Sequence, residues 1–162
     1  LGLFNKASIG HHSSKKTDAQ IRGDFTLWLD DISLSEPVSV FKQFLNELRL
    51  LIAQELFVSL KRVESHFAFY PPGTNYAKHI DNHKGSGARK ITFILYLNEN
   101  WQKGHGGELT LFSPHDENQV LHTLEPLMGG FVLFRSELFP HQVETSLAPR
   151  LSLTGWFRDD NI

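Results

Sequence analysis

Two histidines and one aspartate stand at a spacing that suits a metal ion. His79 and Asp81 are two residues apart in YAKHIDNHKG, on a stretch that we expect to form a β-strand. Because alternate residues of a strand point to the same face, both side chains can reach one ion. A third ligand must come from elsewhere, and His141, which opens another expected strand in PHQVETS, has a suitable side chain. The pattern therefore predicts a divalent metal bound by His79, Asp81 and His141.

Two imidazoles and one carboxylate on one side of an ion leave other coordination positions open. This donor set is typical of non-haem iron(II) oxygenases, but zinc accepts the same ligands, so the donor set alone does not choose the metal. His83 alternates with His79 and Asp81, yet the glycines of Gly85-Ser86-Gly87 follow it directly and favour an exposed turn. The other histidines lack this spacing and are expected to be solvated or structural: His11, His12, His66, His105, His115 and His122.

Arg150 favours iron, because its side chain suits a cosubstrate that carries a carboxylate and also binds the metal. It opens the expected strand after His141, so antiparallel pairing can bring it to the same end of the fold. A guanidinium is permanently charged, and its planar donors can grip a carboxylate at two points. The far carboxylate of 2-oxoglutarate, whose keto-acid end chelates iron, needs such a partner. Tyr96 is a second candidate donor, since a buried phenol needs a hydrogen-bond partner, and Thr154 and Trp156 share a face with Arg150 by alternation.

Composition excludes several classes of function. At 162 residues and 18.5 kDa, the chain predicts a single domain spanning residues 1–162. Without cysteine, thiolate metal sites and disulfides are excluded. With 16 Lys+Arg against 18 Asp+Glu, we expect no nucleic-acid partner. No apolar run approaches the roughly 20 residues of a membrane span, so we expect no membrane partner and a cytoplasmic location. A monomer is the default, and the chain opens on Leu1, which leaves open whether residues precede it.

The first half of the chain predicts a loop and a helix. Residues 5–24 (NKASIGHHSSKKTDAQIRGD) are polar and predict a long loop, which composition alone allows to be either a mobile lid or a floppy tail. Residues 35–57 open with a capping serine and Pro37, and apolar residues then recur at three- and four-residue steps from Val40 to Leu56. This pattern predicts an amphipathic helix that supports a sheet.

Residues 61–158 predict a mainly β core. Short alternating or apolar stretches separated by Gly and Pro turns succeed one another, which is typical of a sandwich or barrel. We expect about eight strands, at residues 62–69, 76–81, 89–98, 107–112, 119–124, 130–135, 141–145 and 150–158.

Several ordered motifs, spread over most of the chain, resemble one known family. They are IRGDFTLW, FYPPGTNYAKHIDN, RKITFILYLNENW, GGELTLF and PHQVETSLAPRLSLTGWF. Together they resemble the prolyl-hydroxylase branch of the Fe(II)/2-oxoglutarate dioxygenases, which includes the hypoxia-inducible-factor prolyl hydroxylases and their bacterial counterparts. The resemblance implies a double-stranded β-helix, or jelly roll, flanked by helices on one side. It also favours the lid over the tail for residues 5–24.

The resemblance assigns roles to particular residues of this sequence. It maps His79, Asp81 and His141 onto the iron ligands, and Arg150 with Tyr96 onto a clamp for the 2-oxoglutarate carboxylate. The other residues that it maps onto the pocket and its cosubstrate are Tyr70, Tyr76, Thr92, Thr154 and Trp156, with a loop between Tyr70 and His79 that is one residue shorter than in the animal enzymes. On the substrate side it implies Arg22, Asp24, Tyr76 and Arg89.

These residues and the resemblance lead to one preferred hypothesis with two alternatives. The preferred one is a peptidyl-prolyl hydroxylase that acts on a proline-containing protein or peptide. It would couple decarboxylation of 2-oxoglutarate to succinate with C–H hydroxylation, using Fe(II), 2-oxoglutarate and O2, with ascorbate as a further candidate cofactor. The first alternative is an oxygenase of a free amino acid or small metabolite. The second is a non-catalytic jelly-roll module that binds zinc or another structural ion.

Overall fold

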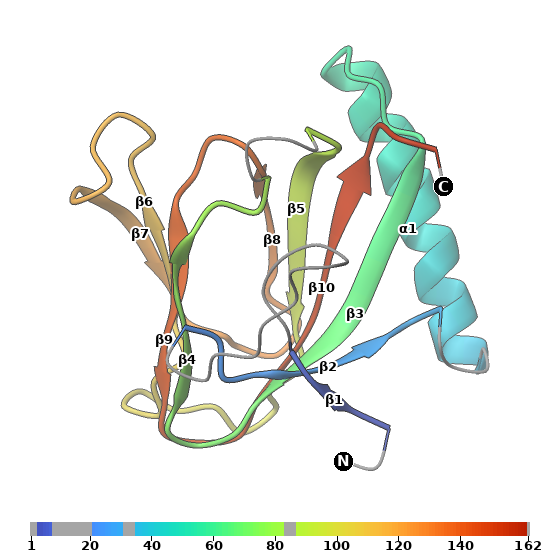
Figure 1. Cartoon of the computed structure of the whole chain (residues 1–162). Helices are drawn as coiled ribbons and strands as arrows, with labels where there is room; N and C mark the ends of the chain where they lie inside the picture. Colours follow the sequence, from blue (N-terminus) through green and yellow to red (C-terminus); the bar gives the residue numbers. More distant parts are fainter. Residues whose placement is uncertain (1–2, 8–20, 31–34, 83–86, 162) are drawn as a thin grey trace.

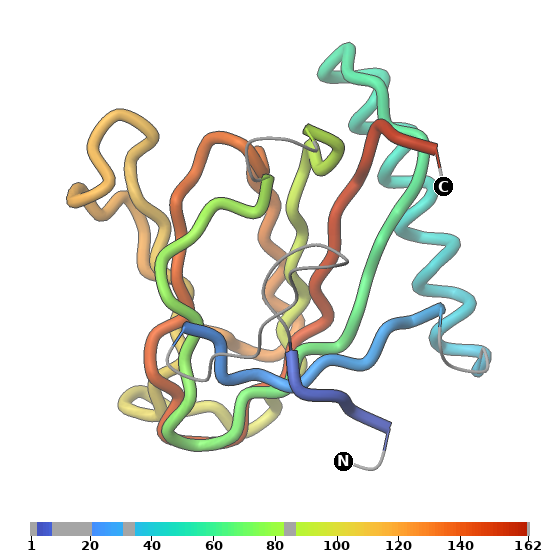
Figure 2. Tube along the Cα trace, in the orientation of Figure 1, coloured from blue at the N-terminus to red at the C-terminus, as the bar shows by residue number. Residues whose placement is uncertain are grey.

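A computed structural model describes residues 3–7, 21–30, 35–82 and 87–161 (Figures 1 and 2). This part of the chain holds ten strands and one helix. In chain order they are β1 (Asn5–Lys6), β2 (Phe25–Trp28), α1 (Glu36–Glu55), β3 (Arg62–Tyr70), β4 (Thr74–His79), β5 (Arg89–Tyr96), β6 (Leu109–Phe112), β7 (Val120–Leu124), β8 (Phe131–Arg135), β9 (His141–Ser146) and β10 (Arg150–Arg158).

The strands form two antiparallel sheets that face one another. The larger sheet has six strands in the order β1-β2-β3-β10-β5-β8, and the smaller has four in the order β4-β9-β6-β7. The last strand, β10, lies in the middle of the larger sheet and pairs with β3 on one side and β5 on the other. Figure 1 shows the smaller sheet on the left and the larger sheet on the right, with α1 beyond it. The prediction of a mainly β fold supported by one helix is confirmed.

All eight expected strands are present, with boundaries shifted by no more than two residues. Two strands were not predicted: β1 lies inside the stretch 5–24 that was expected to be a loop, and β2 follows that stretch. The rest of the expected lid, residues 8–20, lies outside the described residues. One shift matters for the site. Strand β4 ends at His79, so Asp81 lies just beyond the strand rather than on it.

Helix α1 follows its sequence signals closely. Ser35 holds the extended N-cap conformation (φ −76°, ψ 159°), although its side chain forms no capping hydrogen bond. Pro37 occupies the first turn, where a missing N–H costs nothing. The helix ends slightly before the expected residue 57, because Phe57 adopts a positive φ of 52° that no helix continues. No helix in the described part of the chain combines the length and apolar character that crossing a membrane needs.

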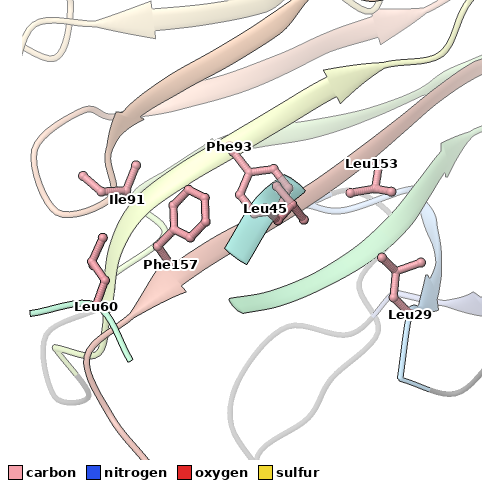
Figure 3. Close-up of a cluster of buried hydrophobic side chains, with 7 residues drawn as sticks. All are labelled: Leu29, Leu45, Leu60, Ile91, Phe93, Leu153 and Phe157. Carbon is pink, nitrogen blue, oxygen red and sulfur yellow. The ribbon is translucent and has the colours of Figure 1, made fainter. Parts of the chain in front are cut away.

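The main hydrophobic core lies between α1 and the outer face of the larger sheet. Leu45 of α1 is fully buried there against Phe93 of β5 and Phe157 of β10 (Figure 3). Because strand residues alternate between faces, the residues between these core positions point the other way, toward the smaller sheet. Packing α1 against one face of β5 and β10 thus fixes which side chains those strands present to the space between the sheets.

Candidate active site

Strand pairing brings the three expected metal ligands together. His79 at the end of β4 lies opposite His141 at the start of β9 in the antiparallel ladder. The His79 Nε2 and His141 Nε2 atoms each lie 3.5 Å from a carboxylate oxygen of Asp81. One ligand atom from each of the three residues falls within 4.8 Å of the others. This arrangement can hold one metal ion through two imidazoles and a carboxylate.

Backbone carbonyls orient both imidazoles. The Nδ1 of His79 lies 2.8 Å from the carbonyl oxygen of Ala77, and the Nδ1 of His141 lies 3.0 Å from that of Phe139. With Nδ1–H donating to these carbonyls, each Nε2 keeps a free lone pair directed at Asp81. Metal-binding histidines commonly use their second nitrogen in this way, which fixes the tautomer and the ring orientation.

The ionisation of the cluster also suits a metal. Burial would raise the pKa of the Asp81 carboxyl, but the nearby His141 and His79 rings more than offset this and hold it well below its usual range. Burial, together with the neighbouring His79, lowers the pKa of His141 to about 4. Thr92 donates a hydrogen bond of 2.8 Å to Asp81 Oδ2 and fixes the carboxylate. Near neutral pH the cluster therefore offers an ionised carboxylate beside neutral imidazole, the form that binds a metal ion.

Arg150 is a buried cation without an anion. Its side chain is 1% exposed, and its Nε donates to the carbonyl oxygen of Gly107 over 2.7 Å. A second nitrogen, Nη1, lies 3.3 Å from Ser152 Oγ. Among the described residues Arg150 forms no ion pair with any carboxylate. Burying an unpaired charge is costly, so this position calls for an anionic ligand.

Tyrosines surround that guanidinium. Its Cζ lies 4.9 Å from the centre of the Tyr70 ring and 5.3 Å from that of the Tyr96 ring. The Tyr96 hydroxyl is buried and has no hydrogen-bond partner among the described residues. Burial raises the pKa of Tyr96, so its hydroxyl stays protonated and can donate. Arg150 and Tyr96 together offer a cation and a neutral donor to one carboxylate.

A single pocket connects the triad to Arg150. Its apolar lining residues come from both sheets: Ala68, Ile94, Leu109 and Val143. The polar residues that line it are Arg22, His66, Tyr70, Tyr76, His79, Asp81, Arg89, Thr92, His141, Arg150, Ser152, Thr154 and Trp156. The structure thus brings all but two of the proposed site residues to this pocket. The two exceptions are Tyr96, which packs beside Arg150 as its ring contact shows, and Asp24.

Asp24 does not line the pocket. It is fully buried, and both its oxygens accept from Arg22, over 2.7 Å to Nε and 3.0 Å to Nη2. Arg22 in turn lies over the Tyr76 ring, with its Cζ 4.6 Å from the ring centre, and its backbone bridges to Tyr76. In this structure the Asp24 carboxylate holds Arg22 at the pocket wall, and the expectation that Asp24 contacts a substrate stays a prediction.

Arg89 is also held in place. Its Nη2 donates to Glu64 Oε1 over 3.0 Å, and its Cζ lies 3.4 Å from the centre of the Trp156 ring. Glu64 accepts from Arg158 as well. Arg89 and Trp156 therefore form a packed wall of the pocket rather than free side chains.

Comparison with known proteins identifies the family. A model of the 2OG-Fe(II) oxygenase superfamily matches residues 65–158, the stretch that carries the triad and Arg150. The chain belongs to this superfamily. Human prolyl hydroxylase EGLN3 is 34% identical over 145 residues, which cover 86% of this chain and 59% of that protein. The chain thus spans little more than half the length of this curated relative.

Solved structures of prolyl hydroxylases share the fold of this chain. A prolyl-4-hydroxylase from Pseudomonas putida superposes with a TM-score of 0.85 at 38% identity, covering 98% of this chain and 78% of that one. A prolyl hydroxylase from Trichoplax adhaerens, solved with a hypoxia inducible factor peptide fragment, gives 0.84 at 29% identity, covering 98% and 71%. The jelly-roll fold and the resemblance to prolyl hydroxylases are both confirmed.

His66 is one of the polar pocket residues that the sequence analysis did not single out, and Ser152, beside Arg150, is another. We expected His66 to be solvated or structural, yet it is 2% exposed and lines the pocket. Alternation could have found it, because His66, Ala68 and Tyr70 share one face of β3. Of the other histidines, His115 and His122 are exposed and His105 is half-buried outside the pocket. His11, His12 and His83 lie outside the described residues.

Proposed function

We propose that this chain is an iron(II)- and 2-oxoglutarate-dependent dioxygenase that hydroxylates a prolyl residue of a protein substrate. One observation carries the proposal: a metal-ligand triad and a buried, unpaired Arg150 share one pocket. A ligand that fits must bind a metal at one end and present a carboxylate at the other. 2-Oxoglutarate has this structure. A structural zinc site would not need the buried cation.

Two groups of residues would hold the two ends of the cosubstrate. His79, Asp81 and His141 would hold the iron, and Arg150 with Tyr96 would bind the far carboxylate, with Tyr70 beside them. When bound, iron and 2-oxoglutarate supply the oxidising chemistry, which couples the decarboxylation of 2-oxoglutarate to succinate with hydroxylation by O2. The protein positions the reactants and excludes bulk water from them.

Each side chain performs part of that task. Thr92 fixes the Asp81 carboxylate, and the carbonyls of Ala77 and Phe139 fix the imidazoles, so the metal would meet a rigid donor set. The apolar wall formed by Ile94, Leu109 and Val143 would exclude water between the two ends. Arg150, already fully buried, would bind the carboxylate without reorganising, which favours one orientation of the cosubstrate.

The protein substrate is inferred from the relatives. The matched proteins are named prolyl hydroxylases, and one was solved with a peptide fragment bound. We place the substrate at the end of the pocket near Arg22, Tyr76 and Arg89, and we propose that residues 5–24 close over it as a lid. We further propose that residues 1–162 form a single dioxygenase domain.

An anaerobic titration tests the cosubstrate assignment. Adding Fe(II) and then 2-oxoglutarate should produce the visible charge-transfer absorption of an iron-bound keto acid, and His141→Ala should abolish it while leaving the protein folded. If folded wild-type protein shows no band, the assignment is wrong.

Mass spectrometry then tests the substrate class. An array of proline-centred peptides, incubated with the Fe(II)- and 2-oxoglutarate-loaded enzyme in air, should include peptides that gain one oxygen on proline. Free amino acids serve as the comparison. Oxygen gain on a free amino acid alone would identify a small-molecule oxygenase instead.

A further inference from the structure

The backbone of Gly107, in the turn before β6, packs directly against Arg150. Its carbonyl oxygen accepts the hydrogen bond of 2.7 Å from Arg150 Nε. A Cβ atom at Gly107 would lie 2.7 Å from Arg150 Cδ, which is closer than carbon atoms approach unless one of them shifts. The positive φ of 77° also disfavours every residue but glycine at this position. Gly107 thus holds the guanidinium with its carbonyl and leaves room for it by having no side chain.

Arg150 has little room to move away from Gly107. Its side chain is 1% exposed, and its Cζ lies 4.9 Å from the centre of the Tyr70 ring and 5.3 Å from that of the Tyr96 ring. Because packed interiors transmit small displacements, a shift of Cδ would move the guanidinium out of its present position. A side chain at Gly107 would therefore misplace the cation that the pocket offers to a carboxylate.

The turn that carries Gly107 is itself fixed to the end of β9. The Gly107 N–H donates to the carbonyl oxygen of Thr145 over 3.2 Å, and the indole N–H of Trp101 donates to the carbonyl oxygen of Gly106 over 2.9 Å. Strand β9 begins at His141, one of the three metal ligands. The strand that positions this ligand therefore also positions, through the turn, the carbonyl that holds Arg150.

The hydrogen bond to Gly107 determines which donors Arg150 can offer to a ligand. A guanidinium has five N–H donors, one at Nε and two each at Nη1 and Nη2. Gly107 accepts from Nε and Ser152 from Nη1, and no hydrogen bond among the described residues engages Nη2. A carboxylate must therefore bind end-on, through Nη1 and Nη2 together.

We propose that Gly107 is a positioning residue for 2-oxoglutarate, which holds Arg150 so that Nη1 and Nη2 face the far carboxylate of the cosubstrate. Gly107 does not line the pocket, so it acts through Arg150 and not by contact with the ligand. The inference rests on the proposed function and deepens it. Gly107 sets the affinity for the far carboxylate and leaves the binding of the keto-acid end to the metal unchanged.

A comparison of two keto acids tests this role. 2-Oxobutyrate has the keto-acid end of 2-oxoglutarate but lacks the far carboxylate. The visible charge-transfer band of the anaerobic Fe(II) protein measures the Kd of each. Gly107→Ala should weaken the binding of 2-oxoglutarate about ten- to hundredfold, because a charged hydrogen-bonding partner is misplaced, and should change that of 2-oxobutyrate by about twofold or less. A general loss of structure would weaken both keto acids alike.

Two controls separate the displacement of Arg150 from other effects of the added methyl group. Gly104→Ala introduces a Cβ at a similarly unfavourable φ of 95°, where it meets no neighbouring atom within 4 Å, and should keep the preference for 2-oxoglutarate. A Cβ at Gly107 would also lie 2.9 Å from Ser146 Oγ. Ser146→Ala removes that oxygen, so Gly107→Ala should cause the same loss in the Ser146→Ala protein as in the wild type.

An NMR measurement on the wild type tests the contact without changing the glycine. In Zn(II)-loaded protein labelled with 13C and 15N, Arg150 Nε should show a through-hydrogen-bond coupling to the carbonyl carbon of Gly107. The coupling should persist after 2-oxoglutarate is added, because the carboxylate binds the Nη atoms instead. Arg150→Met assigns the signal by removing it.

The outcomes separate the inference from the proposed function. If the wild type binds both keto acids equally, Arg150 does not bind the far carboxylate, and the cosubstrate assignment fails together with the inference. If the wild type prefers 2-oxoglutarate and Gly107→Ala keeps that preference, or Gly104→Ala loses it equally, the proposed function stands and the inference is overturned. Loss of the Nε coupling when 2-oxoglutarate binds would overturn the inference as well, whether or not Gly107→Ala folds.

Discussion

The side chains around Asp81 show how the site depends on single hydrogen bonds. Asp81 accepts from Thr92 over 2.8 Å, and Thr92 Oγ1 lies 2.8 Å from Ser136 Oγ. The Ser136 side chain is fully buried, so this chain of hydroxyls has a fixed geometry. The Thr92 hydroxyl thus holds the carboxylate that both imidazoles face. A metal bound there would depend on a residue that does not touch it.

Replacing Thr92 tests that dependence. Thr92→Val keeps the branched shape and removes the hydroxyl, so Asp81 loses its orienting donor. We expect metal affinity to fall about 10- to 100-fold, the usual effect of removing such a supporting group. Competition with a chelator, using Co(II) as a spectroscopic probe, measures this change. Thr123→Val on the exposed strand β7 is the control, and an unchanged affinity in Thr92→Val would contradict the assigned role.

His66 links the pocket to the pH dependence of stability. Burial lowers its pKa from the ordinary value of 6.5 to about 3, so the unfolded chain binds a proton first as the pH drops. Stability from this group is complete above about pH 6.5 and is lost as the pH falls toward 3.

The loss can be measured against a variant that does not titrate. Between pH 8 and pH 5 the titration of His66 should lower the free energy of unfolding by about 2 kcal/mol. In urea unfolding of the metal-free protein, the wild type should lose about 2 kcal/mol more between pH 8 and pH 5 than His66→Met does, because His141, whose pKa is also lowered, titrates in both proteins. Parallel pH dependences in the two proteins would show that His66 is not buried in the neutral form.

Secondary-structure elements were the level at which the sequence was most informative. Turn residues such as Pro71-Pro72-Gly73 and Gly129-Gly130 separate the core strands, and alternation along β10 correctly places Thr154 and Trp156 on the same face as Arg150. Strand β2 was missed because its four residues, all apolar or Thr, show too short a pattern to separate from the preceding loop. The end of β4 was placed too late because the alternation of His79, Ile80 and Asp81 continues after strand pairing has stopped.

Helix α1 tests the packing that fixes those faces. Leu45 is fully buried against the larger sheet, so Leu45→Ala should remove about 2–5 kcal/mol from the unfolding free energy. Leu50, on the same helix, is 54% exposed, and Leu50→Ala should change stability by about 0.5 kcal/mol or less. Chemical denaturation measures both. Comparable losses in the two variants would mean that the helix does not pack on the sheet through Leu45.

The two ends of the site, the histidine ligands and Arg150, lie on different sheets of the molecule. The histidine ligands lie on β4 and β9 of the smaller sheet, whereas Arg150 lies on β10 of the larger one. The sequence predicted these residues and their strands, but not the pairing of His79 with His141 or the burial of Arg150 without an anion. Both depend on how distant strands meet, which local alternation does not encode. A single sequence also gave no reason to separate Asp24, which is buried behind Arg22, from residues that face the pocket.

This division between the sheets predicts how ligands stabilise the fold. A ligand that binds the metal and Arg150 together joins the two sheets, so 2-oxoglutarate should raise the melting temperature only when a metal is present. At a concentration 100 times its Kd it should add about 2.7 kcal/mol to the unfolding free energy, beyond the effect of the metal alone. Thermal unfolding with Zn(II), with 2-oxoglutarate, and with both measures the coupling. In Arg150→Met the metal should still stabilise the protein, but the added stabilisation by 2-oxoglutarate should disappear. Arg62→Met, which breaks an ion pair with Asp160 away from the site, is the control and should keep the stabilisation by 2-oxoglutarate. An increment that survives in Arg150→Met would show that the far carboxylate of the cosubstrate binds elsewhere.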